Sequence, residues 1–392
     1  MKVALDATPL LGVRTGVGAF CAGALAALAE RTDLDVGAFA VSWRRRGELD
    51  RLLPPGVHNV QRAMPARPLH VTWSHLSGPP VEWFIGPVDV VHGTNYVVPP
   101  ARRAARVVTV HDLTTVRFPE LCDAASLQFP RLVRRAARSG AWVHTPSRFV
   151  AQEVVAELGV DPARVRPVHH GIPGVGPRGV DAYIESADED RRRREGEGES
   201  HDQLPNDFLP RDARRYVLGI GTIEPRKDYP ALVRAFDVAT QRIDDVALVI
   251  AGADGWGTSA FERALDGARR RDRVVRLGYV APQSLSSLLA GAAAVAYPSV
   301  YEGFGFVPLE AMAAGIPVVA TAAGAIPEVV ADGALLVAPG DDAALAEALV
   351  TVLCDEASRS ALVERGRLRA ASFTWEACAE GLAELYAAAA DD

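Results

Sequence analysis

The sequence predicts an α/β protein made of two doubly wound, Rossmann-like halves. Short apolar runs rich in Val, Ile and Ala alternate with helical patterns, as in βαβ units whose parallel strands are covered on both faces. The alternation occurs in two series that a polar stretch separates. A length of 392 residues allows each half to bury a core of its own. We therefore expect two domains with separate parallel sheets.

The first half is expected over residues 1–173. Its apolar runs have the length of strands, and the patterns between them have the length and periodicity of helices. The expected elements, in order, are the strand Val3–Leu5, the helix Gly18–Glu30, the strands Val36–Val41, Val88–Val91 and Val107–Val110, the helix Leu127–Arg138, the strand Trp142–Thr145, the helix Ser147–Leu158 and the strand Val165–Val168.

A polar insertion is expected over residues 174–210. Its central run, Asp188–Ser200, contains only Asp, Glu, Arg, Gly and Ser. Such a segment cannot bury enough apolar surface to offset the entropy of ordering, so we expect a mobile linker without chemistry of its own. The acids around its arginines argue against a nucleic-acid patch.

The second half is expected over residues 211–372, and a last helix over residues 373–392. The same alternation of apolar runs and helical patterns continues here. The expected elements are the strand Tyr216–Ile220, the helix Pro230–Arg242, the strand Val246–Ala251, a helix ending at Arg271, the strand Val274–Leu277, the helix Ser284–Ala290, the strand Ala292–Tyr297, the helix Val307–Ala314, the strands Val318–Ala320 and Leu335–Val337, and the helix Ala343–Leu353.

Composition indicates a globular protein of a reducing compartment. The four cysteines, Cys21, Cys122, Cys354 and Cys378, lie far apart without metal-ligand spacing, which argues against a zinc site or a disulfide framework. The segment Met1–Asp6 leads into a strand without the apolar region of a signal peptide, and no apolar run is long enough to span a bilayer. We expect a cytoplasmic protein.

Charge is unevenly distributed along the chain. The net charge of −7 is the result of +6 over residues 1–172 and −13 over the remainder. A basic first half suits an anionic acceptor or a peripheral contact with a membrane, and the arginine-rich runs Trp43–Arg46 and Arg131–Arg138 are the candidates for that contact. A solvated helix face explains the arginines equally well. No motif for nucleic-acid binding is present.

The segment Tyr297–Gly315 places two carboxylates on either side of a glycine-rich turn. Glu302 is expected at the carboxyl end of a buried strand and Glu310 about two turns into the following helix. Doubly wound sheets bind ligands at this rim. Gly303 and Gly305 permit close approach of the backbone, and the N–H groups of the helix start point into the same space. We predict a site for hydroxyls or phosphate oxygens.

Positive charge is expected at the same rim from the loop that follows the strand Tyr216–Ile220. Arg226 offers a planar fork of donors and Lys227 a point charge, the combination that a departing diphosphate requires. In the first half, Gly16 and Gly18 are expected in a loop ahead of a helix, where the backbone can pass close to a phosphate or an acceptor.

Two histidines follow strands of the first half. His111 is expected to face the ligand and to orient the reacting centre, with Asp112 as its support. For His92, a structural role is favoured over acceptor binding, because a histidine at the end of a buried strand is by default a hydrogen-bonded structural group.

These motifs together resemble the retaining family-4 glycosyltransferases of the GT-B fold. The spacing of Glu302 and Glu310 resembles the E-x7-E signature of that family, and the surrounding pieces YPS, EGFG, EAMAAG and PVVAT resemble it as well. Residues 219–228 resemble its G-x-x-E-P-R-K element. The resemblance covers nearly the whole chain. It implies two Rossmann-like domains that face each other across a cleft, with the C-terminal helix crossing back to the first domain.

The resemblance also implies roles for single residues. The first glutamate of the signature holds hydroxyls of the transferred sugar, the second holds the ribose of the nucleotide, and the basic pair holds the diphosphate. The implied catalytic residues are His111, Glu302 and Lys227. The implied donor-binding residues are Gly16, Gly18, Arg226, Lys227, Tyr279, Val280, Glu302, Gly303, Phe304, Gly305, Val307 and Glu310.

The implied activity is transfer of a hexose from a nucleotide sugar to a hydroxyl of a glycan, lipid-linked or natural-product acceptor, with retention at the anomeric carbon. Mannose from GDP-mannose is slightly favoured. No metal or other cofactor is expected, because the basic pair supplies the charge that a metal ion supplies elsewhere. Two alternatives stay open: a nucleotide-sugar epimerase of the same architecture, and a non-catalytic subunit that binds sugar nucleotides.

Overall fold

The computed structural model describes residues 1–12, 16–42, 45–62, 78–172 and 208–392, together with 64, 69, 72, 73 and 76. The chain forms an N-terminal unit, Met1–Arg191 with Phe373–Asp392, and a C-terminal unit, Arg192–Ser372. The polar insertion expected over 174–210 lies outside the described residues as far as 207. Within the described part, no helix is both long and apolar enough to cross a bilayer.

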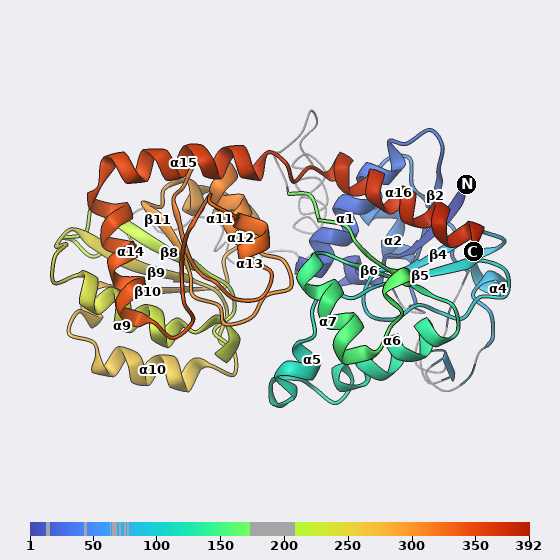
Figure 1. The fold of residues 1–392 in the computed structure, drawn as a ribbon, viewed down its shortest axis with the longest axis horizontal. Helices are drawn as coiled ribbons and strands as arrows, with labels where there is room; N and C mark the ends of the chain where they lie inside the picture. The colour runs from blue at the N-terminus through green and yellow to red at the C-terminus, as the bar shows by residue number, and fades with distance from the viewer. Residues whose placement is uncertain are drawn as a thin grey trace. The chain divides into compact units, whose positions relative to one another are not determined.

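The N-terminal unit is built on a seven-stranded parallel sheet (Figure 1). Its order is β3-β2-β1-β4-β5-β6-β7, so the chain moves outward from β1 on one side and from β4 on the other. The loops that follow β1 and β4 diverge at this switch point, where doubly wound sheets bind ligands. The strands are β1 (Lys2–Asp6), β2 (Asp35–Phe39), β3 (His58–Asn59), β4 (Val90–Gly93), β5 (Ala105–Thr109), β6 (Trp142–Thr145) and β7 (Val165–Pro167).

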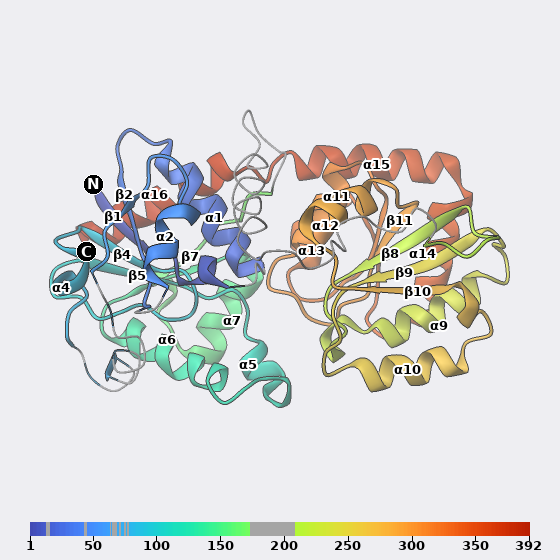
Figure 2. The same ribbon diagram turned by 180° about the vertical axis from the view of Figure 1, so that it is seen from behind.

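Helices cover both faces of this sheet. Figures 1 and 2 show α1 and α16 on one side and α6 and α7 on the other. The α-helices of the unit are α1 (Gly16–Ala29), α2 (Arg46–Leu52), α4 (Glu82–Ile85), α5 (Thr114–Arg117), α6 (Phe129–Arg138), α7 (Arg148–Leu158) and α16 (Trp375–Asp391).

The last helix of the chain completes the core of the N-terminal unit. The helix α16 packs against α1 and against the strands β4 and β5. Gly23 permits the approach of the two helices, because a Cβ at this position would lie 2.2 Å from the ring of Trp375. Gly171 is equally constrained, since its Cβ would lie 2.4 Å from the Trp375 backbone nitrogen.

The C-terminal unit repeats the architecture with a six-stranded sheet of order β10-β9-β8-β11-β12-β13. All its strand pairs are parallel, and the switch point lies between β8 and β11. The strands are β8 (Arg215–Ile220), β9 (Val246–Ala251), β10 (Val274–Gly278), β11 (Ala294–Tyr297), β12 (Val318–Thr321) and β13 (Leu335–Val337). The helices are α9 (Tyr229–Ala239), α10 (Thr258–Gly267), α11 (Pro282–Ala290), α12 (Phe306–Ala313), α13 (Ile326–Val330), α14 (Asp342–Cys354) and α15 (Glu356–Ala370).

The predicted elements are present, with shifted ends where packing sets the boundary. The helix α1 begins at Gly16 and not at Gly18, so both glycines lie in its first turn and not in a loop ahead of it. Burial of its apolar side chains, and not helix propensity, stabilises this glycine-containing turn. The strand β4 starts two residues later than expected, because Val90 is the partner of Val3 in the parallel register with β1.

Candidate functional site

The loops that follow β8 and β11 meet at the switch point of the C-terminal sheet. The Val300 N–H donates a hydrogen bond of 2.9 Å to the carbonyl of Arg226, which ties the two loops together. Because β8 and β11 are neighbours in a parallel sheet, their carboxyl ends lie side by side. Residues 75 positions apart in the chain are thereby brought into contact.

The loop after β8 is held by backbone geometry at both ends. Gly221 has φ of +133°, and its N–H donates to the carbonyl of Ala251 at 2.9 Å. Asp228 adopts the left-handed conformation with φ of +43°, and its carboxylate caps α9 by accepting from the Ala231 N–H. Between them, Arg226 and Lys227 lie in a short 3-10 turn. These backbone contacts fix the position of Arg226 and Lys227 at the carboxyl end of β8.

Glu302 forms ion pairs with both cations. Its Oε2 lies 2.8 Å from Nη1 of Arg226, and its Oε1 lies 2.7 Å from Nζ of Lys227. The Lys227 ammonium also donates to the hydroxyl of Tyr297 at 2.8 Å, and Nη2 of Arg226 contacts Glu224 at 2.7 Å. This set of Glu224, Arg226, Lys227, Tyr297 and Glu302 is called the clamp below.

The clamp keeps Glu302 ionised in a buried place. Only 8% of the residue is exposed, and burial by itself raises the pKa of a carboxylic acid. The Lys227 ammonium and the Arg226 guanidinium outweigh that cost and lower the pKa of Glu302 to about 2. The clamp thus holds a carboxylate between two cations at the rim where an anionic ligand is expected.

Glu310 has a different environment from Glu302. It is the fifth residue of α12, so it lies about one turn into the helix and not two as predicted. Within the described part of the chain its carboxylate makes no hydrogen bond or ion pair, and burial raises its pKa to about 7. A buried carboxyl group with a raised pKa at the carboxyl rim of a Rossmann-like sheet is a candidate for contact with a ligand.

The loop after β12 positions the backbone of Glu302. The Ala325 N–H donates to the Glu302 carbonyl at 2.8 Å, and Gly324 has φ of +58°. A Cβ at Gly324 would lie 2.3 Å from the Glu302 carbonyl oxygen, so only glycine fits here. The sequence analysis missed Gly324, Tyr297 and Glu224. The glycine that follows the strand Val318–Ala320 was the available signal, since loops at this rim are expected to line the site.

The other predicted donor-binding residues of this unit lie at the same end of the sheet. Gly303, Phe304 and Gly305 are buried in the turn before α12, and Val307 is partly exposed in its first turn. Tyr279 and Val280 follow the edge strand β10, two strands from β8, and Tyr279 is 64% exposed. The predicted set is therefore spread along the carboxyl rim, with the clamp at its centre.

The remaining candidates, Gly16, Gly18 and His111, belong to the N-terminal unit. His111 follows β5, and its Nε2 lies 2.8 Å from the carbonyl of Thr94, which follows β4. This contact orients the ring with the Nε2 proton donated to the carbonyl. Burial lowers the pKa of His111, so the imidazole is neutral near pH 7.

Asp112 acts on His111 through its charge, which opposes the lowering of the histidine pKa, and not through a hydrogen bond within the described residues. Its carboxylate accepts instead from the Tyr96 hydroxyl at 3.1 Å and from the Thr114 N–H at 2.8 Å. The short Asp side chain closes a local turn at the start of α5, and that local bond competes with one to the preceding histidine.

His92 has the structural role that the sequence analysis favoured. It is fully buried, with Nδ1 2.7 Å from the Tyr386 hydroxyl of α16 and Nε2 2.7 Å from the Thr109 hydroxyl. Thr109 in turn lies 2.9 Å from Nδ1 of His144. The histidines His92, His111, His144 and His170 surround Phe20, and this group is called the histidine cluster below.

Both halves of the chain match models of known families. Residues 200–369 match the model of the glycosyl transferases group 1, and residues 14–173 match that of glycosyltransferase family 4. The chain belongs to the family-4, group 1 glycosyltransferases. Family membership confirms the resemblance that the motifs predicted.

Two curated relatives illustrate the range of this family. The O-antigen chain mannosyltransferase B of Escherichia coli is 36% identical over 164 residues, which are 42% of this chain and 43% of the relative. A D-inositol 3-phosphate glycosyltransferase of Salinispora arenicola is 29% identical over 297 residues, which are 71% of this chain and 62% of the relative. The chain thus spans about two fifths and three fifths of the length of these relatives.

A solved structure has the same fold over its whole length. HepE of Anabaena, solved in complex with UDP and glucose, has a TM-score of 0.66 at 19% identity and covers 99% of this chain and 100% of its own. This likeness and the two sheets confirm the predicted GT-B fold.

Proposed function

We propose that the protein is a glycosyltransferase that moves a sugar from a nucleotide-sugar donor to a hydroxyl acceptor. The observation that carries this proposal is the clamp, in which Glu302 contacts both Arg226 and Lys227 at the switch point of a Rossmann-like sheet. A nucleotide sugar has the two features that such a clamp recognises, a diphosphate for the cations and a polyol for the carboxylates. Family membership supports the proposal.

Five residues receive a role in the proposed reaction. Arg226 and Lys227 hold the diphosphate and stabilise the charge that develops as it leaves. Glu302 accepts from hydroxyls of the transferred sugar, and Glu310 accepts from the ribose diol. His111, in the N-terminal unit, is proposed as a contact to the sugar or phosphate that orients the reacting centre.

The proposed chemistry is same-face substitution with retention. The bond from the anomeric carbon to the diphosphate oxygen breaks, the acceptor oxygen bonds to the same carbon, and the acceptor proton passes to the leaving diphosphate. No metal is required, because Arg226 and Lys227 carry the neutralising charge. The expected rate is therefore unchanged by EDTA.

The donor is proposed to be GDP-mannose, and the name of the Escherichia coli relative, a mannosyltransferase, supports the sugar of this proposal. The structure of HepE with UDP supports a nucleotide donor of a different base. Calorimetric titration with GDP, UDP and ADP sugars distinguishes these donors. GDP-mannose is expected to have a dissociation constant well below those of the UDP and ADP sugars.

The chain offers a matched pair of variants for this titration, because Lys2 and Lys227 are its only lysines. Lys227→Ala removes a charge-assisted bond to the diphosphate and is expected to weaken donor binding by about tenfold or more. Lys2→Ala removes the same charge from an exposed side chain and is expected to change nothing. Equal affinity for both variants would contradict the assignment of the clamp.

Incubation with donor alone tests the class of reaction. The proposed enzyme releases nucleoside diphosphate slowly, with the sugar in its original anomeric configuration. An epimerase would return an altered nucleotide sugar, and a non-catalytic subunit would return the donor unchanged.

A further inference from the structure

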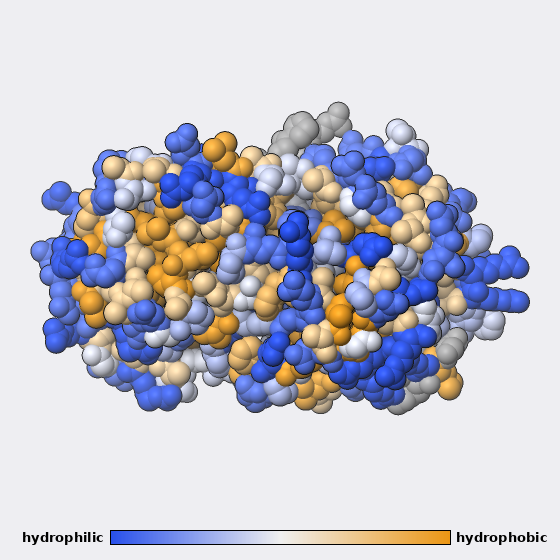
Figure 3. All heavy atoms as spheres, in the orientation of Figure 1, coloured by the Kyte–Doolittle hydropathy of each residue, from blue (hydrophilic) through white to orange (hydrophobic). Residues whose placement is uncertain are grey.

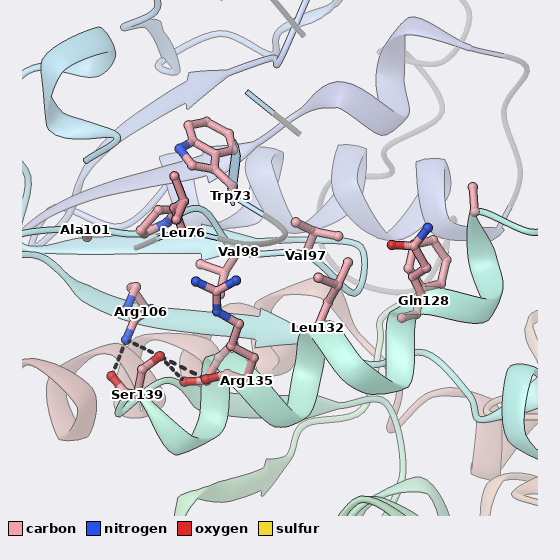
Figure 4. A pocket seen from close by; sticks show the side chains of 14 residues that line it. Trp73, Leu76, Val97, Val98, Ala101, Arg106, Gln128, Leu132, Arg135 and Ser139 are labelled. Carbon is pink, nitrogen blue, oxygen red and sulfur yellow. Dashed lines mark hydrogen bonds between the residues drawn. The ribbon is translucent and has the colours of Figure 1, made fainter. Parts of the chain in front are cut away.

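The N-terminal unit contains a pocket that the proposed reaction does not use. It lies between α6 and the segment of residues 97–101, and its volume is about 500 Å³ (Figure 4). This size is in the range of small-molecule sites. Its lining residues are Trp73, Leu76, Val97, Val98, Pro100, Ala101, Arg106, Ala125, Gln128, Phe129, Leu132, Arg135, Ala136 and Ser139.

The walls of the pocket are apolar, and its charges are all positive. Trp73, Leu76, Val97 and Leu132 present hydrocarbon surface, and Leu76 is 62% exposed although it is a large apolar residue. No carboxylate is among the lining residues. Figure 4 shows Arg106 and Arg135 near one end of the pocket and Gln128 at the other.

Arg106 is a half-buried cation without an anionic partner. Its Nη2 donates to the carbonyl and the hydroxyl of Ser139, and in the described part of the chain it makes no ion pair. Burial lowers its pKa, which is the cost of keeping a guanidinium among apolar groups. Glu82, whose charge acts on Arg106, is engaged by backbone N–H groups of residues 102–104. Donors of Arg106 stay available to a ligand.

Arg135, from α6, also lacks an anionic partner in the described part of the chain. Its side chain has neither a hydrogen bond nor an ion pair to any described residue. The helix α6 contains four arginines and no acid, and Figure 3 shows polar side chains gathered over its position. Two unpaired guanidinium groups at one end of an apolar pocket are complementary to an anion with an apolar body.

We propose that this pocket binds an anionic amphiphile, a phosphate held by Arg106 and Arg135 whose aliphatic chain lies against Trp73, Leu76, Val97 and Leu132. The site is separate from the clamp, which lies in the other unit, so its occupancy does not depend on the proposed function. A lipid phosphate is the ligand class that supplies both parts in one molecule. Inorganic phosphate lacks the chain, and an uncharged detergent lacks the anion.

Three ligands of graded chemistry test this site in the full chain. Calorimetric titration with monomeric dodecyl phosphate is expected to show saturable binding of one molecule. Inorganic phosphate is expected to bind at least about tenfold more weakly, since it lacks the apolar contact. Dodecyl maltoside, used below its critical micelle concentration, is expected to bind at least about tenfold more weakly as well, since it lacks the charged hydrogen bonds. Equal binding of dodecyl phosphate and dodecyl maltoside would overturn the proposal.

Arginine variants on one helix supply the matched control. Arg135→Gln and Arg106→Gln are each expected to weaken dodecyl phosphate binding by about tenfold. Arg138→Gln removes the same charge from α6 at an exposed position that does not line this pocket, and it is expected to leave affinity unchanged. Equal weakening by all three variants would show a diffuse charge effect and overturn the site.

A membrane surface is the competing partner, and vesicles separate it from the pocket. Binding to vesicles of anionic phospholipid without binding to monomeric dodecyl phosphate would replace the pocket by a surface contact and overturn the proposal. Titration of the Arg135→Gln variant with nucleotide sugar checks that the fold is intact. A failed donor titration with intact dodecyl phosphate binding would overturn the proposed function alone.

Discussion

At the scale of single residues, Glu302 forms ion pairs with both cations that are proposed to bind the donor diphosphate. Its carboxylate lies within 2.8 Å of Arg226 and within 2.7 Å of Lys227. Donor binding must therefore exchange a protein carboxylate for a phosphate, or share the cations between both. In the proposed reaction, Glu302 therefore competes with the diphosphate for the two cations and also contacts the sugar.

Replacing Glu302 by Gln is expected to separate these two roles. Removal of the negative charge frees both cations, so the affinity for UDP or GDP alone should rise on the order of tenfold. Sugar transfer should fall by two or more orders of magnitude, because the contact to the sugar is lost. Calorimetry and a donor-release assay measure the two effects. The exposed Glu347→Gln serves as control, and weaker nucleotide binding by Glu302→Gln would refute the competition.

In its proposed role as the ribose contact, Glu310 is expected to make donor binding dependent on pH. Burial raises its pKa to about 7, so its carboxyl group is largely neutral at pH 6 and largely ionised at pH 8. The ionised form accepts both hydroxyls of a ribose, so the affinity for a nucleotide sugar should rise by up to about tenfold between these pH values. Glu310→Gln is expected to bind weakly with a flat profile. A profile of the same slope in the variant would assign the titration to another group.

At the scale of secondary-structure elements, the turn before α13 contacts the turn before α12 and limits its position. Gly324 contacts the backbone of Glu302 closely enough that no Cβ fits between them. The carboxyl ends of β11 and β12 are thus coupled through their loops, in addition to their register.

Gly324→Ala tests this coupling. The new methyl group and the positive φ both oppose the native geometry, so the free energy of unfolding should fall by about 2 kcal/mol and nucleotide affinity should fall with it. Gly267→Ala is the matched control, because a Cβ at this position of α10 meets no atom within 4 Å. That change is expected to be neutral or to stabilise by about 0.5 kcal/mol. Urea unfolding and calorimetry compare the two.

At the scale of the whole molecule, the histidine cluster makes the N-terminal unit sensitive to acid. Burial lowers the pKa of His144 to about 3, those of His92 and His170 well below their usual value, and that of His111 in the same direction. In the unfolded chain these histidines titrate with the ordinary pKa of about 6.5. Below that pH the unfolded chain therefore binds more protons than the folded chain. Stability is fully present above pH 6.5 and is lost as pH falls from 6.5 toward 3.

Urea unfolding between pH 7 and pH 5 measures this loss. Each cluster histidine contributes up to about 1.4 kcal/mol for every pH unit below 6.5. Tryptophan fluorescence reports on this unit, because five of the six tryptophans lie in its residue ranges. His144→Gln should reduce the pH dependence by the contribution of one histidine, and the exposed His58→Gln should leave it unchanged. An unfolding free energy that does not change over this pH range would contradict the assignment.

The sequence by itself determined the parallel sheets, the family and the rim on which the site lies. Alternating apolar runs and helical periods are local signals, and the glycine-rich turn at Glu302 and the basic loop at Arg226 are contiguous motifs. The strands β6 and β9 have the bounds that the sequence predicted, and every residue of both strands is buried.

Only the tertiary structure decided which of these groups contact one another. Glu302 meets Lys227 across 75 residues, and His92 meets Tyr386 across 294, because strand order and the return of α16 set those distances. The hydrogen bonds of Asp112 also depend on the fold, since its carboxylate accepts from Tyr96 and from the Thr114 N–H of a local turn. A pattern along the chain determines the local preference for helix, strand or turn. Contacts between distant side chains depend instead on how the parallel strands are ordered in the sheet.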